Sequence, residues 1–293
     1  MTVHPMDDTT VVITGGNSGI GLETAVALAA SGADVVLGCR SDEKAAAAVD
    51  DIRRRSGNDS VVSHRLDLAD LDSVKAFAGR LSALDRIDVL VNNAGMLLDE
   101  RRETAQGFEA VFGTNHLGPF LLTNLLLDQV RAAPAGRIVN VASFGHAASI
   151  GGIQWGDIGR HRQYSGWRVY GDSKLANILH AEALTRRVEG TGVVANALHP
   201  GGVSTNFGRD GDTQGLTGRM LEMDWLGERL AVVKSAAEGA ATSVHLASSP
   251  EAGRVSGGYW VNSRLSRTRP WSRRPGDADE LWARSQRMIA TVR

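Results

Sequence analysis

The sequence predicts an α/β fold in which a seven-stranded parallel sheet carries helices on both faces. Short runs rich in Val and Ile alternate with longer segments rich in Ala and Leu, which is the pattern of repeated strand and helix units. The short runs are almost continuously apolar, as is typical of strands covered by helices on both faces. The predicted strands cover residues 10–14, 34–39, 61–66, 87–92, 137–142, 193–198 and 258–261.

Helices are predicted between these strands, and Asp42 and Asp70 are suitable N-caps for two of them. Two segments, 144–167 and 203–233, mix Gly, Met, Trp and charged residues without a clean period. Both follow the carboxyl end of a strand, where ligands bind in open α/β sheets, so we expect them to shape a substrate pocket. The predicted helices cover residues 19–30, 43–55, 71–84, 104–131, 169–188 and 235–247.

Composition narrows the class of protein. No linker divides the 293 residues, so we predict one domain over 1–293, with a substrate loop at about 203–233 and a tail at 264–293. The net charge is −1 and the basic residues are spread along the chain, which favours a small-molecule partner over nucleic acid or a membrane. Cys39, the only cysteine, forms neither an intrachain disulfide nor a zinc site alone, and no metal site is predicted.

Targeting signals are also missing from the sequence pattern. Residues 1–10 do not resemble a signal peptide, and no uninterrupted apolar run reaches the roughly 18 residues that span a bilayer. We therefore expect a cytoplasmic protein.

A glycine-rich turn joins the first predicted strand to the first predicted helix. Glycines allow a tight turn and a close approach to a pyrophosphate, while the helix N-terminus offers unpaired N–H groups to the phosphates. The alternative is a plain connection between strand and helix. The position of the turn favours a dinucleotide site, and its residues are Thr14, Gly15, Gly16, Asn17, Ser18, Gly19, Ile20 and Gly21.

Arg40 follows the second predicted strand, where a cofactor without a 2′-phosphate usually meets a carboxylate. Arginine pairs with a phosphate and stacks on adenine better than lysine does. NADP(H) is therefore favoured, and NAD(H) stays an alternative. The other interpretation is that Arg40 is solvated and pairs with Asp42.

Tyr170 and Lys174 stand four residues apart in a predicted helix, so their side chains share one face. The chain has only three tyrosines and four lysines, so this spacing is rare by chance; the alternative is an exposed helical pair. A phenol has a pKa of about 10, and a nearby ammonium favours its ionised form and lowers that pKa. The pair therefore predicts an acid–base catalyst.

Two further polar residues are candidates for the same site. Ser143, at the end of the fifth predicted strand, would donate to a developing oxyanion, or it caps the strand end. Asn115 interrupts an apolar helix, where burial demands a partner. It is either a structural hydrogen-bonding residue or a link in a proton path.

Together these motifs resemble the short-chain dehydrogenase/reductase family over nearly the whole chain. That family has a Rossmann-type domain, which implies the strand order 3-2-1-4-5-6-7 here. The residues that carry the resemblance are Thr14, Gly15 to Gly21, Asp67, Asn92, Asn93, Ala94, Gly95, Asn115, Ser143, Tyr170, Lys174, Pro200 and Gly201.

The resemblance implies a catalytic tetrad of Asn115, Ser143, Tyr170 and Lys174. Tyr170 would exchange a proton with the substrate oxygen, and Lys174 would lower the pKa of Tyr170 and hold the nicotinamide ribose. Ser143 would orient the carbonyl, and Asn115 would support a water relay. Asp67 would meet the adenine, and Thr205 the carboxamide. The implied cofactor contacts beyond the glycine turn and Arg40 are Asp67, Leu68, Asn93, Ala94, Gly95, Tyr170, Lys174, Pro200, Gly201, Val203 and Thr205.

Within the family, the chain resembles the retinol-dehydrogenase-like branch, which includes WW-domain oxidoreductases and light-dependent protochlorophyllide reductases. The cues are Gly38-Cys39-Arg40, the 27-residue gap between Ser143 and Tyr170, the run 173–177, His199-Pro200-Gly201, Trp260 and Trp282. This resemblance also favours NADP(H). The chain lacks the N-terminal anchor of the animal retinol enzymes, so retinoid substrates are not implied. Its single cysteine argues against a light-driven reaction.

The predicted function is interconversion of a ketone or aldehyde and an alcohol on a lipophilic small molecule. Apolar residues in the two irregular segments either line a pocket or cover the protein's own core and a subunit contact. Alternatives are a non-catalytic NADP(H) sensor or scaffold, a C=C reductase, or a tailoring ketoreductase of secondary metabolism. The resemblance implies a homodimer or homotetramer, unless the tail covers the helices that join subunits. The apolar residues are Ile150, Ile153, Trp155, Phe207, Leu216, Met220, Leu221, Met223, Trp225 and Leu226.

Overall fold

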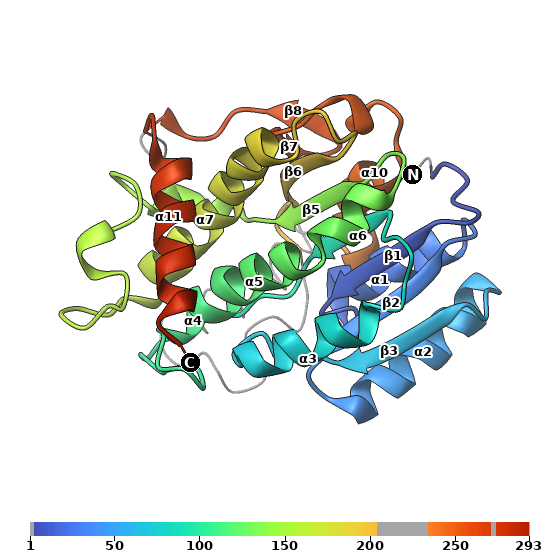
Figure 1. Ribbon diagram of the computed structural model, residues 1–293, viewed down its shortest axis with the longest axis horizontal. Coiled ribbons are helices and arrows are strands. Elements are labelled where there is room, and N and C mark those ends of the chain that lie inside the picture. Colours follow the sequence, from blue (N-terminus) through green and yellow to red (C-terminus); the bar gives the residue numbers. More distant parts are fainter. Residues whose placement is uncertain (1–2, 204–233, 271–273, 293) are drawn as a thin grey trace.

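The computed structural model describes residues 3–203, 234–270 and 274–292. They form one sheet in the order β3-β2-β1-β4-β5-β6-β7-β8 (Figure 1). The strands are β1 (Thr10–Thr14), β2 (Asp34–Cys39), β3 (Val61–Arg65), β4 (Val89–Asn92), β5 (Arg137–Val141), β6 (Val194–His199), β7 (Tyr259–Val261) and β8 (Arg264–Ser266).

The seven predicted strands and their parallel order are confirmed. The structure adds β8, which pairs antiparallel with β7 and lies in the segment predicted as a tail. The sheet therefore has eight strands where the sequence predicted seven. The three side chains of β8 are all exposed, so this strand has no buried face that a sequence pattern could display.

Helices cover both faces of the sheet. The α-helices are α1 (Gly19–Ala29), α2 (Asp42–Ser56), α3 (Leu71–Leu81), α4 (Ala110–Phe112), α5 (Gly118–Leu125), α6 (Leu127–Ala132), α7 (Gly166–Arg187), α10 (Ala236–Ser248) and α11 (Asp277–Ala290). The shorter turns are η1 (Gly113–Leu117), a π-helical turn, and the 3₁₀ turns η2 (Phe144–Ala148), η3 (Trp155–Asp157) and η4 (Ala252–Arg254).

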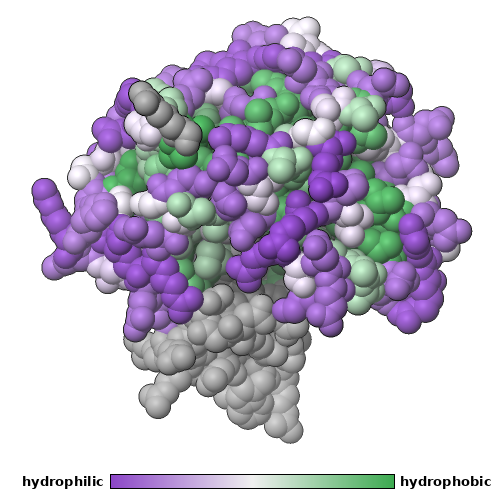
Figure 2. Space-filling view, turned by 60° about the horizontal axis from the view of Figure 1, so that its bottom comes forward, coloured by the Kyte–Doolittle hydropathy of each residue, from purple (hydrophilic) through white to green (hydrophobic). Residues whose placement is uncertain are grey.

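Two apolar cores lie on opposite sides of the sheet. Val12 of β1 faces the core shared with α3, α5, α6, α7 and α11, while its neighbours Val11 and Ile13 face the core shared with α1, α2 and α10. All three side chains are fully buried, as expected for a strand between two helical layers. Polar side chains cover most of the face seen in Figure 2. Every helix in the described ranges is too short or too polar to span a bilayer.

The helix predicted over 104–131 is broken into four pieces in the structure. It begins only at α4, because the Glu109 carboxylate accepts hydrogen bonds from the N–H groups of Val111 and Phe112 and caps the helix there. The turn η1 follows, and Pro119 explains it in part, since proline has no N–H to donate to the Asn115 carbonyl. A further break separates α5 from α6.

The predicted tail contains the helix α11, which packs against α7 (Figure 1). Its buried residues Ala278, Leu281, Trp282 and Ser285 follow the spacing of one helical face. Ser285 Oγ lies 2.7 Å from Nε2 of the fully buried His116 in η1. The tail therefore completes one of the two cores.

Candidate active site

The glycine turn bends back over the carboxyl end of β1. Gly15 and Gly19 have φ of 66° and 54°, which favours glycine at both positions. A Cβ on Gly21 would lie 2.3 Å from the Gly15 carbonyl oxygen, and one on Gly16 would lie 2.5 Å from Leu37 Cδ2. The turn therefore approaches its neighbours more closely than larger residues allow.

The N-terminus of α1 is open to an anion. Ser18 is the N-cap, but its side chain makes no capping hydrogen bond, and the first turn of the helix has no acidic residue. Unpaired N–H groups and the helix dipole favour a phosphate at such an end. Asn17 and Ile20 are half-buried beside it, and Ser18 is exposed. The residues present fit the pyrophosphate of a dinucleotide.

The segment after β4 supports the glycine turn. Asn93 Nδ2 donates to the carbonyl oxygens of Thr14 at 2.9 Å and Gly15 at 3.1 Å. Thr14 Oγ1 accepts from the backbone N–H groups of Asn93 and Ala94. A Cβ on Gly95 would lie 3.0 Å from Lys174 Nζ. The structure thus places Asn93 and Ala94 beneath the turn and Gly95 beside Lys174.

Arg40 stands exposed directly after β2. The interpretation that it pairs with Asp42 does not hold: among the described residues Arg40 forms no ion pair, and Asp42 lies 3.7 Å from Arg65 instead. The Arg40 guanidinium is therefore available to a phosphate.

Two further predicted cofactor contacts, Asp67 and Leu68, follow β3. Asp67 Oδ1 accepts from the N–H of Ala69 at 2.9 Å, and Asp67 N donates to Ser73 Oγ. The side chain of Leu68 is buried in the core. Only Asp67 of this pair keeps a half-exposed side chain that a cofactor could meet.

Ser143, Tyr170 and Lys174 come together as the sequence predicted. Ser143 follows β5 and accepts a hydrogen bond from the N–H of Gly145 at 3.0 Å, which leaves its hydroxyl proton for the Tyr170 phenol, its second partner. Lys174 Nζ lies 5.6 Å from the centre of the Tyr170 ring and donates to the Val141 carbonyl oxygen at 3.0 Å. Tyr170 and Lys174 are both buried.

Burial sets the proton affinities of this pair. It raises the pKa of Tyr170 to about 12, and the hydrogen bond from Ser143 offsets only part of that rise. It lowers the pKa of Lys174 to about 8. The sequence argument predicted that the ammonium lowers the pKa of the phenol, whereas in the structure loss of solvation outweighs any such effect. At neutral pH the phenol is therefore a proton donor.

Asn115 is fully buried in η1 and makes structural hydrogen bonds. Its Oδ1 accepts from Met96 N at 2.7 Å, and its Nδ2 donates to Met96 O and to Ser173 Oγ, both at 2.9 Å. It therefore joins the segment after β4 to α7. This is one of its two predicted roles; the link in a proton path stays a prediction.

The segment after β6 lies at the same sheet edge. Gly201 has φ of 102°, and Val203 pairs with Lys234 in a short parallel bridge. Pro200, Gly201 and Val203 thus lie where the sequence placed them, beyond the end of a strand. Thr205 and most of the predicted substrate loop lie outside the described residues, as do its apolar residues Phe207, Leu216, Met220, Leu221, Met223, Trp225 and Leu226.

The apolar residues of the insertion before Tyr170 were predicted either to line a substrate pocket or to cover the protein's own core. Ile153 is buried in the core and Trp155 packs against it, so both cover the protein's own interior. Ile150 is exposed. None of the three is therefore assigned to a substrate pocket.

Sequence reasoning gave His199 no role of its own at the site. Its Nδ1 accepts from the N–H of Phe144 at 3.1 Å, which ties the end of β6 to the residue after Ser143. Burial lowers the pKa of His199 to about 4, so it stays a neutral acceptor. Its place directly before Pro200 was the only signal in the sequence.

Comparisons with known proteins agree with this geometry. A family model described as short chain dehydrogenase matches residues 9–214. Human (Homo sapiens) retinol dehydrogenase 13 is 40% identical over 285 residues, which cover 96% of this chain and 84% of that protein. A crystal structure of an uncharacterized protein from Mycobacterium paratuberculosis has a TM-score of 0.74 and 33% identity, covering 98% of this chain and 96% of that one. The structure of a short chain dehydrogenase from Burkholderia cenocepacia, in complex with NADP, has a TM-score of 0.68 and 25% identity. The match covers 88% of this chain and 97% of that one.

Proposed function

This chain belongs to the short-chain dehydrogenase/reductase family, and we propose that it uses NADP(H) to interconvert a ketone or aldehyde and an alcohol on a lipophilic small molecule. The observation that carries the proposal is the buried Ser143–Tyr170 hydrogen bond with Lys174 beside it. Alcohol and carbonyl chemistry also agrees with the name of the retinol dehydrogenase relatives.

The residues of the chain divide the work of carbonyl reduction between them. The bound nicotinamide supplies the hydride. With substrate bound, the Ser143 hydroxyl would turn its single proton from the phenol to the substrate oxygen, and the Tyr170 phenol would release its proton to that oxygen as negative charge develops there. The Lys174 ammonium then stabilises the phenolate. Because the phenol keeps its proton at neutral pH, it is in the protonation state that carbonyl reduction requires.

Arg40 supports the choice of NADP(H), because its guanidinium is exposed at the end of β2 and has no acidic partner among the described residues. Replacing it should remove charge-assisted hydrogen bonds worth about 1.5–3 kcal/mol. Arg40→Ala should therefore raise the KM for NADPH by about 10- to 100-fold and leave that for NADH unchanged. An equal effect on both cofactors would refute the assignment.

The function itself is tested by NADPH oxidation with a panel of aryl, steroid and polyketide ketones and with retinaldehyde. We expect turnover on at least one carbonyl, and a loss of about 100-fold or more in Tyr170→Phe with NADPH binding intact. NADPH binding without turnover on every compound would favour the sensor or scaffold. The cytoplasmic location and the homo-oligomeric state stay predictions, which cell fractionation and light scattering would test.

A further inference from the structure

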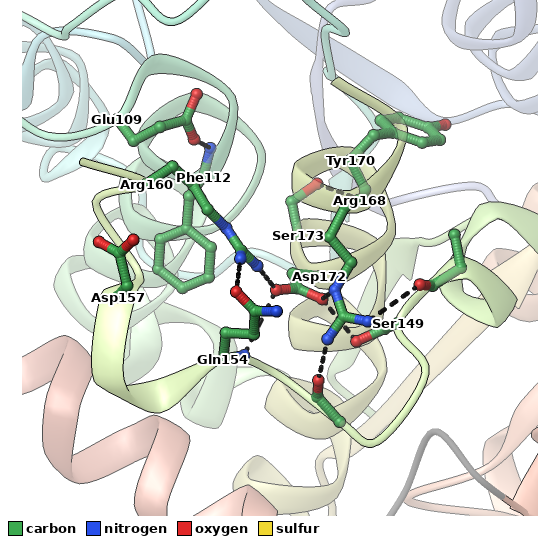
Figure 3. Close-up of polar contacts among 12 residues, drawn as sticks. Glu109, Phe112, Ser149, Gln154, Asp157, Arg160, Arg168, Tyr170, Asp172 and Ser173 are labelled. Atoms are coloured by element: carbon green, nitrogen blue, oxygen red, sulfur yellow. Dashed lines mark hydrogen bonds and ion pairs between the residues drawn. The ribbon is translucent and has the colours of Figure 1, made fainter. Parts of the chain in front are cut away.

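A buried polar cluster joins the catalytic helix to the segment that follows Ser143. Its centre is Asp172, which stands on α7 between Tyr170 and Lys174 and is 3% exposed. Two residues along a helix is about 200° of rotation, so Asp172 points away from the catalytic pair. Figure 3 shows its carboxylate among side chains of the 149–160 segment.

Three groups of that segment bind the Asp172 carboxylate. Ser149 Oγ donates to it at 2.6 Å, and the backbone N–H of Gln154 donates at 3.4 Å. The buried Arg160 guanidinium forms an ion pair with it and also donates to the Gln154 side chain (Figure 3). Arg160 has φ of 52°, a left-handed conformation that is rare in non-glycine residues and that these contacts hold in place.

Arg168 adds a second connection from the same helix. Its Nε lies 3.1 Å from the Asp172 carboxylate. Its two terminal nitrogens donate to the carbonyl oxygens of Ile150 at 2.8 Å and Gly152 at 2.7 Å. The backbone of residues 149–154 is therefore fastened to α7 through one carboxylate and one guanidinium.

The turn η2 directly precedes residues 149–154 and lies against the Tyr170 ring. A Cβ on Gly145 would lie 2.7 Å from Tyr170 Cε1, and one on Gly171 would lie 2.8 Å from the Gly145 carbonyl oxygen. The backbone of η2 therefore packs against the Tyr170 ring and against the backbone of α7 at Gly171. Ser143 is the N-cap of η2, so any displacement of the turn moves the serine hydroxyl relative to the phenol.

We propose that Asp172 is a positioning residue that holds the segment 144–154 on α7 and thereby sets the Ser143–Tyr170 hydrogen bond. The proposal rests on the proposed function, because it assigns these two residues to catalysis. Loss of the carboxylate leaves the buried Arg160 and the half-buried Arg168 without their shared partner. The segment 144–154 should then move away from α7, and Ser143 should lose its hydrogen bond with the Tyr170 phenol.

The test is Asp172→Asn, with Asp157→Asn as the matched control in η3, just beyond the segment. Asp157 accepts hydrogen bonds from the backbone N–H groups of His161 and Arg162 and has none with α7. Since small misplacements at a catalytic centre are costly, kcat should fall about 10- to 100-fold in Asp172→Asn, with the KM for NADPH unchanged. The alkaline rise of alcohol oxidation should move to higher pH, because Ser143 no longer lowers the pKa of Tyr170.

Two further measurements keep the test decisive. Arg160→Gln removes the same ion pair from the other side and should shift the pH profile in the same direction, whereas Asp172→Glu should restore much of kcat. Hydrogen exchange should quicken in peptides from 144–154 but not in those from α7. Folded Asp172→Asn and Arg160→Gln proteins with the wild-type kcat and pH profile would overturn the inference. A wild-type protein without turnover on any carbonyl would overturn the proposed function instead, while hydrogen exchange would still report whether Asp172 holds the segment.

Discussion

Replacing Lys174 by methionine should make the protein more stable and nearly inactive. The side chain is 3% exposed, and burial lowers its pKa from 10.5 to about 8. A tenfold change in proton affinity corresponds to about 1.4 kcal/mol, so burying this ammonium costs about 3 kcal/mol of folding free energy at neutral pH. Methionine avoids that cost and loses one hydrogen bond, worth about 1 kcal/mol. The Val141 carbonyl keeps a partner, because Asn177 Nδ2 donates to it at 3.2 Å.

Lys174→Met should therefore gain about 2 kcal/mol, or roughly 4–8 °C in Tm, while the reduction rate falls by about 100- to 10,000-fold. The gain should also depend on pH. Between about pH 8 and pH 10.5 the folded wild type has released the Lys174 proton, while the unfolded chain still binds it. The unfolding free energy of the wild type therefore rises with pH, and the difference in unfolding free energy between variant and wild type becomes smaller.

Urea unfolding followed by tryptophan fluorescence at pH 7 and pH 9.5 measures this gap. Lys75→Met is the control, because Lys75 is half-exposed in α3 and pairs with Asp72 at the surface. Its stability should change by less than about 1 kcal/mol at either pH. A Lys174→Met protein less stable than the wild type at pH 7, or a gap that does not narrow, would refute the reasoning.

Three other perturbations test separate parts of the structure. Gly21→Ala should abolish NADPH binding in calorimetric titrations, because the added Cβ would lie 2.3 Å from a backbone oxygen. The control Gly79→Ala, whose added Cβ has no atom within 4 Å, should bind NADPH normally. Equal binding by both variants would contradict the close approach at the turn. Ser285→Ala should lower the free energy of unfolding by about 1–3 kcal/mol, because a ring nitrogen of buried His116 loses its hydrogen-bond partner at 2.7 Å. Thermal melting measures this loss, and an unchanged melting temperature would argue against that hydrogen bond. Burial raises the pKa of the Cys39 thiol to about 11, so iodoacetamide should label the native protein at pH 8 far more slowly than the unfolded chain; similar rates would show an accessible thiol.

The sheet could be predicted because its strands are buried on both faces. Val11, Val12 and Ile13 in β1 have no exposed surface, so an uninterrupted apolar run was a reliable signal. The helix over 104–131 was wrong because its local pattern is helical while Glu109 turns back to cap α4. That capping depends on a buried tertiary position, which the pattern does not reveal. Pro119 was a visible sign of irregularity in the same stretch.

The proximity of Tyr170 and Lys174 could be predicted because helical geometry fixes their spacing. The pKa of the phenol could not, since its direction depends on how completely the folded chain excludes water. The role of Asp172 could not be predicted from the sequence either. Its partners Ser149 and Arg160 lie 23 and 12 residues away in a segment without a period, so only the folded structure brings them to one carboxylate.

The helix α7 brings the proposed catalytic groups and a buried charge cluster together. It holds a phenol, an ammonium and a carboxylate within five consecutive residues, 170–174, all of them buried. Each is compensated locally: the phenol stays neutral beside Ser143, the ammonium donates to the end of β5, and Asp172 is shared by two arginines. Arg168 comes from α7 itself, whereas Val141 lies in β5, and Ser143 and Arg160 follow that strand, so most of these partners depend on how the strand end and the segment after it pack on the helix. The contacts that allow α7 to bury these charges therefore lie directly beside the proposed catalytic pair.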